Sequence, residues 1–368
     1  MKVVTAREQL LNAVQIVQRA VSVRNPMPIL AGIKLEAIDG RIFLTATDLD
    51  MGIRCSFEAE ITEPGACVLP ARYISELVRR LPADLPVLIN AEEGSSSVTI
   101  QYGQSETSIN GYPAEEFPDF PIPTSPLVFD LPIEVLRSIV RQVVFAAANN
   151  ENRPVFTGVL FELADGNLQV IATDTYRLAW RRLSLENYEQ TLNIIIPAKT
   201  LTELIKIIEP EKTVNITVTP NQILFKTEDT WLISRLIEGQ FPNYRQVIPQ
   251  EYYTRVRLKT RDLAEATERA SLLADDNSPV IKISLDQNIL VVSVNNEAGR
   301  VHEEIPVFHE GESFQVAFNA RYLNEALKAV GSEEINLEFT GPLSPGVIKP
   351  VGDQDYLSLL LPVRLRGA

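Results

Sequence analysis

The hydrophobic and polar positions of this chain follow the same order three times. The order opens at 6–20 with an amphipathic stretch whose apolar positions form one broad helical face: Leu10, Leu11, Val14, Ile16 and Val17. Thr5 and Glu8 have the spacing of a capping box, so we expect them to begin this helix. Comparable helices are predicted at 133–147 and 261–273. A second helix is predicted later in each copy, at 72–81, 199–209 and 321–330.

Strands separated by turn signals fill the rest of each copy. The turn signals are Asp39-Gly40, Asp165-Gly166 and Asp286-Gln287-Asn288. Two helices and many strands per copy, in runs rather than in strict alternation, indicate the α+β class. We expect the helices to pack on one face of an antiparallel sheet. Sheet edges at the margin of each copy would then be available to pair with a neighbouring copy.

The repetition is also visible residue by residue. Residues 27–48 align without a gap to 153–174, with eight of 22 positions identical at an offset of 126, and 279–296 is a fainter third copy. A period near 120 is too long for a solenoid unit of about 20–50 residues but fits a whole domain. Proline-rich segments at 117–126 and 241–249 read as linkers. The sequence therefore predicts three similar domains, at 1–122, 127–249 and 250–368.

Composition places the chain among ordinary globular proteins. It is 45% hydrophobic and 22% charged, and no apolar run approaches the ~20 residues that cross a bilayer. The N-terminal residues lack the apolar core of a signal peptide, so we expect a cytoplasmic protein without a membrane partner. The only cysteines, Cys55 and Cys67, are expected to be buried thiols rather than a disulfide.

The net charge of −14 argues, taken alone, against a nucleic-acid partner. The charge is nevertheless unevenly divided: the six predicted helices together carry +4, which leaves −18 on the remainder. The helices are thus mildly basic, and the strands and loops are strongly acidic. Two interpretations stay open, a weakly basic surface for phosphates and a plain solvated helix face.

No catalytic constellation stands out. Asp48 and Asp174 occupy equivalent points of separate copies, which favours roles at turns or strand ends over a shared acid/base site. His302 and His309 are the only histidines, with no Cys or carboxylate cluster at metal spacing, and surface positions are expected for both. Phosphate-binding, nucleophile-elbow and dinucleotide motifs are missing from the sequence. We therefore expect neither an enzyme nor a cofactor or metal.

Four segments carry a resemblance to a known family. They are Pro28-Ile-Leu30, Ala172-Thr-Asp-Thr-Tyr-Arg-Leu178, Phe241-Pro-Asn-Tyr-Arg245 and Leu361-Pro-Val-Arg-Leu365. Their order and spacing, together with the triplication, resemble the bacterial sliding clamps, the β subunits of DNA polymerase III, over the whole chain. The resemblance implies a head-to-tail homodimer, in which six similar domains close into a ring with sheets outside and helices lining a central hole.

The resemblance also implies a function. Such a ring encircles duplex DNA without sequence preference and tethers the replicative polymerase as a processivity factor without catalysis of its own. A loose basic lining attracts phosphates over a Debye length of ~8–10 Å without docking to them. The implied protein partners are the DNA polymerase III alpha subunit, the clamp loader, repair factors and other proteins with a clamp-binding motif.

Particular residues are implicated by the same resemblance. Arg24 matches a family position that touches DNA, and Arg153 lies near another such region. The other candidates for the DNA lining are Arg72, Arg79, Arg80, Arg137, Arg141, Lys199, Arg321 and Lys328; each of them also fits an ordinary surface position. The dimer junction falls on Leu272 and Leu273, for which a plain core role is the alternative. No recognition helix and no interleaving of aromatic with basic residues appears in the sequence.

The family's hydrophobic peptide groove maps onto sixteen positions. They are Phe156, Thr173, Thr175, Tyr176, Arg177, Leu178, Pro242, Gln246, Val247, Leu343, Pro345, Leu359, Leu361, Pro362, Val363 and Arg364. Arg177 and Arg364 are expected to anchor polar groups of the peptide above an apolar floor. The chain departs from the family at Thr175-Tyr176, where Gly-His is common, at Gln246, where Arg is frequent, and at Phe156, where Leu is usual. These departures are expected to alter peptide preference.

Two other functional classes remain as alternatives. One is a scaffold of repeated α+β domains that does not bind DNA. The other is an enzyme with a site between domains. The apolar tail at 356–363 is also open to a second interpretation, that of a last core strand, and because strand residues alternate faces, both roles are compatible.

Overall fold

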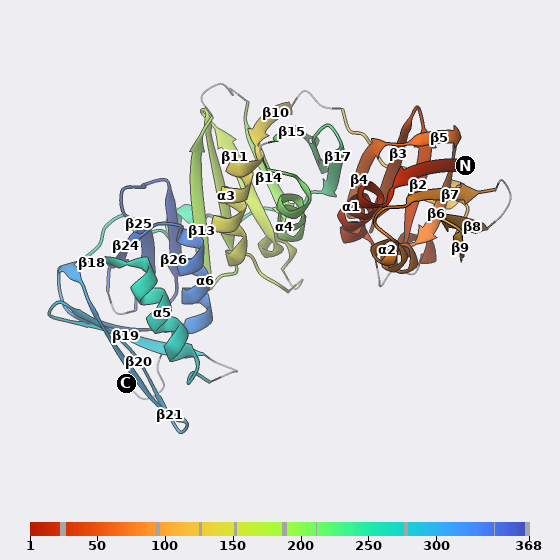
Figure 1. Ribbon diagram of the computed structural model, residues 1–368. Helices are drawn as coiled ribbons and strands as arrows, with labels where there is room; N and C mark the ends of the chain where they lie inside the picture. The colour runs from red at the N-terminus through yellow and green to blue at the C-terminus, as the bar shows by residue number, and fades with distance from the viewer. Residues whose placement is uncertain are drawn as a thin grey trace. The chain divides into compact units, whose positions relative to one another are not determined.

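A computed structural model describes residues 1–22, 27–92, 96–124, 127–150, 153–185, 190–210, 212–275, 279–341 and 343–364 (Figure 1). The elements repeat in the order strand, helix, a set of strands, helix, three strands. The first repeat contains β1 (Lys2–Ala6), α1 (Arg7–Val17), β2 (Gly32–Ile38), β3 (Arg41–Thr47), β4 (Met51–Glu58), β5 (Glu60–Glu63), β6 (Gly65–Pro70), α2 (Ala71–Arg80), β7 (Pro86–Ala91), β8 (Ser97–Tyr102) and β9 (Ser105–Asn110).

The second and third repeats follow the same order. The second contains β10 (Leu127–Pro132), α3 (Ile133–Val143), β11 (Gly158–Ala164), β12 (Asn167–Thr173), β13 (Arg177–Ser184), β14 (Leu192–Pro197), α4 (Ala198–Ile207), β15 (Thr213–Val218), β16 (Gln222–Lys226) and β17 (Thr230–Arg235). The third contains β18 (Thr254–Lys259), α5 (Thr260–Ser271), β19 (Val280–Asp286), β20 (Ile289–Asn296), β21 (Gly299–Pro306), β22 (Phe308–Glu310), β23 (Phe314–Asn319), α6 (Ala320–Val330), β24 (Glu334–Phe339), β25 (Gly346–Pro350) and β26 (Tyr356–Leu360). The predicted α+β class with three similar domains is confirmed.

Short 3-10 helices complete the order. Two of them extend the first helices of their repeats, η1 (Gln18–Ala20) after α1 and η4 (Val144–Ala146) after α3. The remaining ones are η2 (Pro28–Ala31), η3 (Ala114–Glu116), η5 (Pro154–Thr157) and η6 (Tyr244–Gln246). The aligned segments 27–48 and 153–174 therefore have the same structure, a 3-10 turn that begins with proline and two strands joined by a tight turn.

All pairings between the named strands are antiparallel, and they form four sheets. The strand orders are β5-β1-β7-β8-β9, β10-β15-β16-β17-β4-β3-β2-β6, β14-β11-β12-β13-β26-β25-β24-β18-β22 and β21-β20-β19-β23. In two of them a strand of one repeat pairs with a strand of the next, β17 with β4 and β13 with β26. The described residues form two compact units, Met1–Leu136 with Thr202–Leu236 and Arg137–Leu201 with Ile237–Ala368. Since these units cut across the repeats, the predicted domain boundaries stay a prediction.

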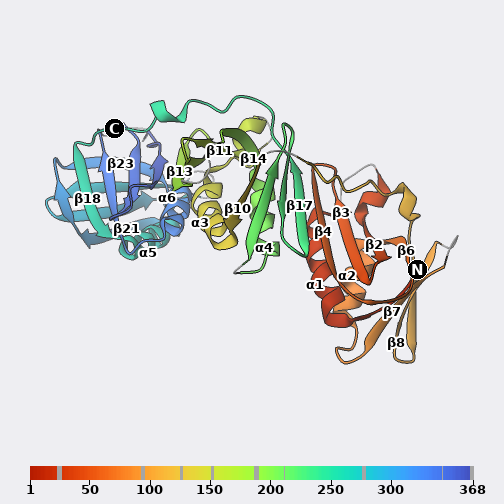
Figure 2. The ribbon, with the colours of Figure 1, turned by 90° about the horizontal axis from the view of Figure 1, so that it is seen from above.

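The helices pack against the strands of their own repeats through small and aliphatic residues. In the third repeat, α5 and α6 lie side by side against the strands (Figure 1). Leu263, Ala266 and Ala270 of α5 are fully buried in one cluster with Leu323 and Leu327 of α6. In the first repeat, α1 lies along β4 and β3 (Figure 2). Burial of such apolar area, worth ~25 cal/mol per Å², is the main stabilising contribution to each repeat.

The predicted capping box is wrong. Thr5 lies in β1, opposite Val87 of β7, and it is buried. The helix begins one residue after Ala6, whose side chain offers no acceptor to the first turn. Because the strand pairing fixes the backbone of Thr5, its hydroxyl is held away from the helix. A side-chain cap is present on α6 instead, where the Asn319 oxygen accepts the backbone N–H groups of the second and third residues after the cap.

Candidate functional site

An apolar groove of about 220 Å³ lies where strands of the second and third repeats pair. Its lining consists of Phe156, Thr173, Thr175, Tyr176, Arg177, Leu178, Pro242, Asn243, Tyr244, Val247, Leu359 and Leu361. Leu178 and Leu359 face each other across the pairing of β13 with β26, and both are nearly inaccessible. Val247 and Leu361 are 51% and 41% exposed. The groove thus combines a closed floor with apolar side chains that are open to a ligand.

The structure brings together ten of the sixteen predicted groove residues. The six others do not line this groove: Gln246, Leu343, Pro345, Pro362, Val363 and Arg364. Leu343 is 71% exposed, and the backbone N–H of Val363 donates to the carbonyl of Ala317 on β23 at 2.8 Å. The sequence mapping missed Asn243 and Tyr244. Both lie in Phe241-Pro-Asn-Tyr-Arg245, one of the four segments that carry the family resemblance. The aromatic side chain within that segment was the feature of the sequence that could have identified Tyr244 as a groove residue.

Tyr244 forms a fixed wall of the groove. Its side chain is 4% exposed, and its hydroxyl lies 2.9 Å from a carboxylate oxygen of Glu162 and 3.1 Å from the amide oxygen of Gln169. Burial and the hydrogen bond to Glu162 raise the pKa of Tyr244, so the phenol stays neutral near pH 7. The ring therefore presents carbon to the groove while its polar end is satisfied on β11 and β12.

One tight turn, between β12 and β13, places the central groove residues. The Asp174 Oδ1 accepts the backbone N–H groups of Tyr176 at 2.9 Å and Arg177 at 3.0 Å. The Thr173 hydroxyl donates to the carbonyl of Arg177 at 2.7 Å and accepts the N–H of Thr175 at 3.2 Å. The backbone hydrogen bonds between β12 and β13 end at this turn, and the side-chain hydrogen bonds take their place. They hold the Tyr176 side chain outward, where it is 61% exposed.

The same turn is present in the first repeat. Asp48 Oδ1 accepts the N–H groups of Asp50 at 3.1 Å and Met51 at 2.7 Å, and the Thr47 hydroxyl donates to Met51. The turn and strand-end roles expected for Asp48 and Asp174 are thereby confirmed. Both turns force a non-glycine residue into the left-handed region, Leu49 with φ 76° and Thr175 with φ 79°. Thr175 is the more strained because it is β-branched.

Arg177 is bound inside the protein rather than presented to a ligand. Its side chain is 4% exposed, and its guanidinium pairs with Asp174 at 3.0 Å and with Glu325 of α6. Its charge also lies over the rings of Tyr322 at 4.3 Å and Phe145 at 5.4 Å. Burial alone would raise the pKa of Glu325, but hydrogen bonds from Arg177 and Arg321 hold it below its ordinary value. Within the chain Arg177 joins the turn to α6, and the expected anchoring of a peptide by Arg177 stays a prediction.

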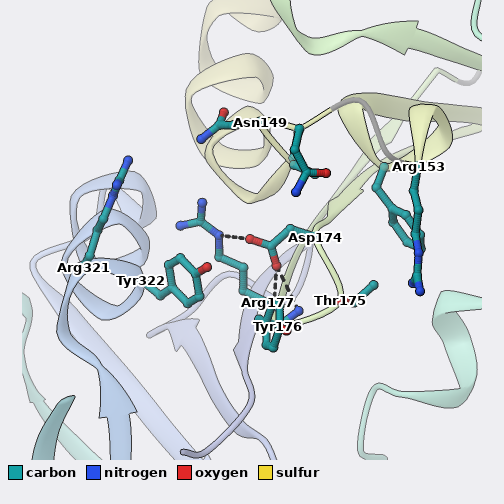
Figure 3. A pocket seen from close by; sticks show the side chains of 12 residues that line it. Asn149, Arg153, Asp174, Thr175, Tyr176, Arg177, Arg321 and Tyr322 are labelled. Atoms are coloured by element: carbon teal, nitrogen blue, oxygen red, sulfur yellow. Dashed lines mark hydrogen bonds and ion pairs between the residues drawn. The ribbon is translucent and has the colours of Figure 1, made fainter. Parts of the chain in front are cut away.

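A second, more polar hollow of about 490 Å³ lies beside the groove and shares Phe156, Thr175, Tyr176 and Arg177 with it. Figure 3 shows Arg321 and Tyr322 entering it from α6, opposite Arg153. Its remaining residues are Ala147, Ala148, Asn149, Asn150 and Asp174. Two of the predicted DNA-binding residues, Arg153 and Arg321, thus line opposite sides of one hollow that adjoins the apolar groove (Figure 3).

The other predicted DNA-binding residues that the structure describes lie on helices. Arg72, Arg79, Arg80, Arg141, Lys199 and Lys328 are exposed, Arg137 is half-buried, and Arg24 lies outside the described residues. Several of these cations are paired with carboxylates on the same surface. Glu76 binds both Arg79 at 2.8 Å and Arg80 at 2.5 Å, and Lys328 lies 2.8 Å from Glu268. The helix surface consequently carries a weaker positive field than its count of cations suggests.

The two leucines assigned to a dimer junction differ in environment. Leu272 is 81% exposed, whereas Leu273 is half-buried and packs against the core of the third repeat. A fully solvated leucine at a helix end gains nothing from the fold of its own chain. Leu272 is therefore available to a partner surface, and Leu273 contributes partly to the core.

Chemistry-bearing clusters do not emerge in the part of the chain that the structure describes. No group of three or more His, Cys, Asp or Glu side chains is placed there to hold a metal ion. Cys55 and Cys67 are buried free thiols, and burial raises the pKa of each to about 12, which keeps them unreactive. His302 on β21 is exposed, and His309 on β22 is half-buried. Among the described helices, none combines the length and apolar character needed to cross a membrane.

Comparisons with known proteins agree over the full length. Models of the DNA polymerase III beta subunit match 1–121 as the N-terminal domain, 130–243 as the central domain and 245–364 as the C-terminal domain. The beta sliding clamp of Bacillus subtilis (strain 168) is 35% identical over 379 residues, which cover 99% of this chain and 100% of that protein.

Solved structures of sliding clamps are also similar to this chain over nearly its full length. The crystal structure of the DNA polymerase sliding clamp from Bacillus subtilis gives a TM-score of 0.95 at 35% identity and covers 99% of both chains. A sliding clamp from Pseudomonas aeruginosa bound to griselimycin gives a TM-score of 0.94 at 27% identity, covering 99% of this chain and 100% of that one.

The strained turn yields a testable prediction. Thr175→Gly should raise the free energy of unfolding by about 1 kcal/mol, because relief of ~1–3 kcal/mol of backbone strain exceeds the ~0.5–1 kcal/mol entropic cost of glycine. Urea unfolding of both proteins measures the difference. Thr45→Gly is the matched control, since Thr45 lies within β3 at an ordinary strand conformation, and it should destabilise. Equal losses for both variants would contradict the assignment of strain to Thr175.

Proposed function

This chain belongs to the DNA polymerase III beta subunit family, whose clamp function is to tether the polymerase to DNA, and we propose that it does so as a head-to-tail ring of two chains closed around the duplex. The ring is a processivity factor, and the polymerase that it carries performs the chemistry. Its three domains are assigned to 1–122, 127–249 and 250–368. It works in the cytoplasm, where its DNA is, without cofactor or metal.

The main support for a ring is that the same pairing of strands between repeats occurs twice within the chain. At the first junction β4 pairs with β17, and at the second β13 pairs with β26. The two have the same register: Cys55 faces Thr230, and the residues 126 positions later, Arg181 and Tyr356, face each other as well. Consecutive repeats are therefore joined in the same way. The third strand after the first helix of one repeat pairs with the last strand of the following repeat.

The same rule leaves one junction open in a single chain. Within the described residues, β21 is the strand equivalent to β4 and β13, and β9 is equivalent to β17 and β26; each has a neighbour on one side only. The third repeat of one chain and the first repeat of a partner therefore supply the missing pair. Because both chains do so, the assembly is closed with two-fold symmetry and no unpaired edge remains at a junction.

The ends of the first helices support the same junction. Arg19, after α1, pairs with Glu203 of α4 in the next repeat at 2.8 Å. Phe145, at the corresponding place after α3, packs against the core of the third repeat. The corresponding residue after α5 is Leu272, which is solvated in one chain. In the ring, Leu272 takes the place of Arg19 and Phe145 and contacts the first repeat of the partner.

Electrostatics favour a loose hold on DNA. The candidate contacts are Arg24, Arg72, Arg79, Arg80, Arg137, Arg141, Arg153, Lys199, Arg321 and Lys328. Carboxylates neutralise part of this set, as at Glu76, so few phosphate contacts are made at a time. Since each neutralised phosphate adds to affinity and to its salt dependence, a weak lining permits sliding and leaves retention to the topology of the ring.

The groove is the proposed docking site for peptide motifs of the DNA polymerase III alpha subunit, the clamp loader and repair proteins. Its apolar floor and open rim suit two or three hydrophobic side chains of an extended segment. Phe156, Thr175, Tyr176 and Gln246 depart from the family and tune the peptide preference. Pro345, Pro362, Val363 and Arg364, which lie beyond the groove, are assigned to the ends of a longer peptide.

Retention on DNA tests the ring. After loading by a clamp loader, the protein should remain on nicked circular DNA and leave linear DNA of the same length, because only free ends let a closed ring slide off. Gel filtration of the protein–DNA mixture at about 0.5 M NaCl measures the bound fraction and suppresses contacts that depend on charge. Equal retention on both DNAs would contradict encirclement.

Cysteine cross-linking tests the register of the closing junction. Repetition places Val301 of β21 opposite Thr107 of the partner's β9, as Ile53 is opposite Leu232. A chain carrying both Val301→Cys and Thr107→Cys should form a covalent dimer on oxidation, because Cα atoms of facing strand residues lie within disulfide reach. Non-reducing electrophoresis measures it. His302→Cys with Thr107→Cys is the control, since neighbouring strand residues face opposite sides and should not cross-link.

A charge in the groove tests the docking site. Val247→Asp should weaken binding of a clamp-binding peptide by at least about tenfold, because a carboxylate at an apolar contact costs more than ~1.4 kcal/mol. Fluorescence anisotropy with a labelled peptide measures affinity. Phe308→Asp, at a position that is 82% exposed and outside the groove, is the matched control and should bind normally. Unchanged binding by Val247→Asp would place the peptide elsewhere.

A further inference from the structure

The strand register that closes the ring also fixes which polar side chains meet there. On β21, Val301 and Ile305 face the core, so Arg300, His302 and Glu304 lie on the other face of the strand. On β9, Ile109 is buried, so Glu106 and Ser108 lie on the outer face. In the register of the two junctions within the chain, Arg54 faces Trp231 and Trp180 faces Leu357. The corresponding pair at the closing junction is His302 with Glu106 of the partner chain.

Within its own chain, His302 has a carboxylate as its nearest charged neighbour. Nε2 of His302 lies 3.0 Å from Oε1 of Glu304. On the neighbouring strand β20, the residue opposite His302 is Ser293, which does not titrate. The hollow that His302 lines on this sheet face also contains Asp275, Lys282, Asp286 and Arg300, two acids and two bases. The dominant neighbour is therefore Glu304.

Closing the ring adds a second carboxylate beside the same imidazole. With neutral His302, Glu106 of the partner approaches Glu304, and like charges on facing strands repel. With protonated His302, a cation lies between the two carboxylates. Arg300 faces Ser108 and lies diagonal to Glu106, so it contributes an attraction that does not change with pH. Neither junction within the chain has a side chain at this position that titrates near neutral pH.

From this arrangement, and resting on the proposed ring, we infer that protonation of His302 tightens the closing junction between two copies of this chain. Closure raises the proton affinity of the imidazole. The resulting stabilisation is complete below the ordinary titration range of histidine and is lost as pH rises through it, between about pH 5 and 8. A tenfold gain in proton affinity at each junction changes the dimer dissociation constant by up to about a hundredfold, because the ring has two junctions.

Sedimentation of the full chain across this pH range at constant ionic strength tests the inference. The dimer dissociation constant should fall by roughly ten- to a hundredfold between about pH 8 and pH 6. His302→Gln and Glu106→Gln should each flatten the profile, because each removes one partner of the titrating contact. His309→Gln is the matched control: it changes the only other histidine, which is half-buried on β22 with Nδ1 beside the Asn288 side chain, and it should keep the full profile.

The outcomes separate the inference from the ring itself. A stable dimer whose dissociation constant does not change with pH, or a full pH profile in His302→Gln, overturns the role of His302 and leaves the ring intact. A monomer at every pH and at micromolar concentration contradicts the ring. Thermal unfolding of the monomeric fraction at low concentration verifies that the variants are folded, since both substituted side chains are on the surface.

Discussion

The structure depends on one constraint, the antiparallel pairing of a strand in one repeat with the last strand of the next. A sheet edge with unpaired backbone groups is costly to bury and prone to wrong pairing. The chain satisfies this constraint twice internally, at β4 with β17 and at β13 with β26, in a single register. Among the described strands, β9 and β21 each keep one such edge, and in the proposed ring two copies pair these edges with each other.

The apolar groove depends on the second of these junctions. Leu178 and Leu359 form its floor because β13 and β26 are neighbours there, and Arg177 holds the turn beside it to α6 through Glu325. The residues come from repeats that are distant in sequence. Any change that separates the two strands removes the groove as well, so the groove and the integrity of the second junction are coupled.

The two junctions within the chain share a backbone arrangement with the proposed closing junction but differ from it in side-chain chemistry. Within the chain, ion pairs such as Arg41 with Asp229 and Arg182 with Asp355 lie beside the paired strands, at 2.8 Å and 2.5 Å. At the proposed closing junction the outer face of β21 carries His302 and Glu304 instead. In the proposed ring, the closing junction therefore differs in side-chain chemistry from the two junctions within the chain.

The sequence by itself determined the helices, the tight turns and the threefold order, because periodicity and turn chemistry are local. It also determined the family, through motifs such as Phe241-Pro-Asn-Tyr-Arg. Only the tertiary structure decided that Thr5 belongs to a strand and not to a helix cap, since β7 lies far along the chain. It likewise decided that Arg177 is enclosed by Asp174 and Glu325, and that Tyr244 is part of the groove. Each of these roles is set by a neighbour distant in sequence, to which local patterns are blind.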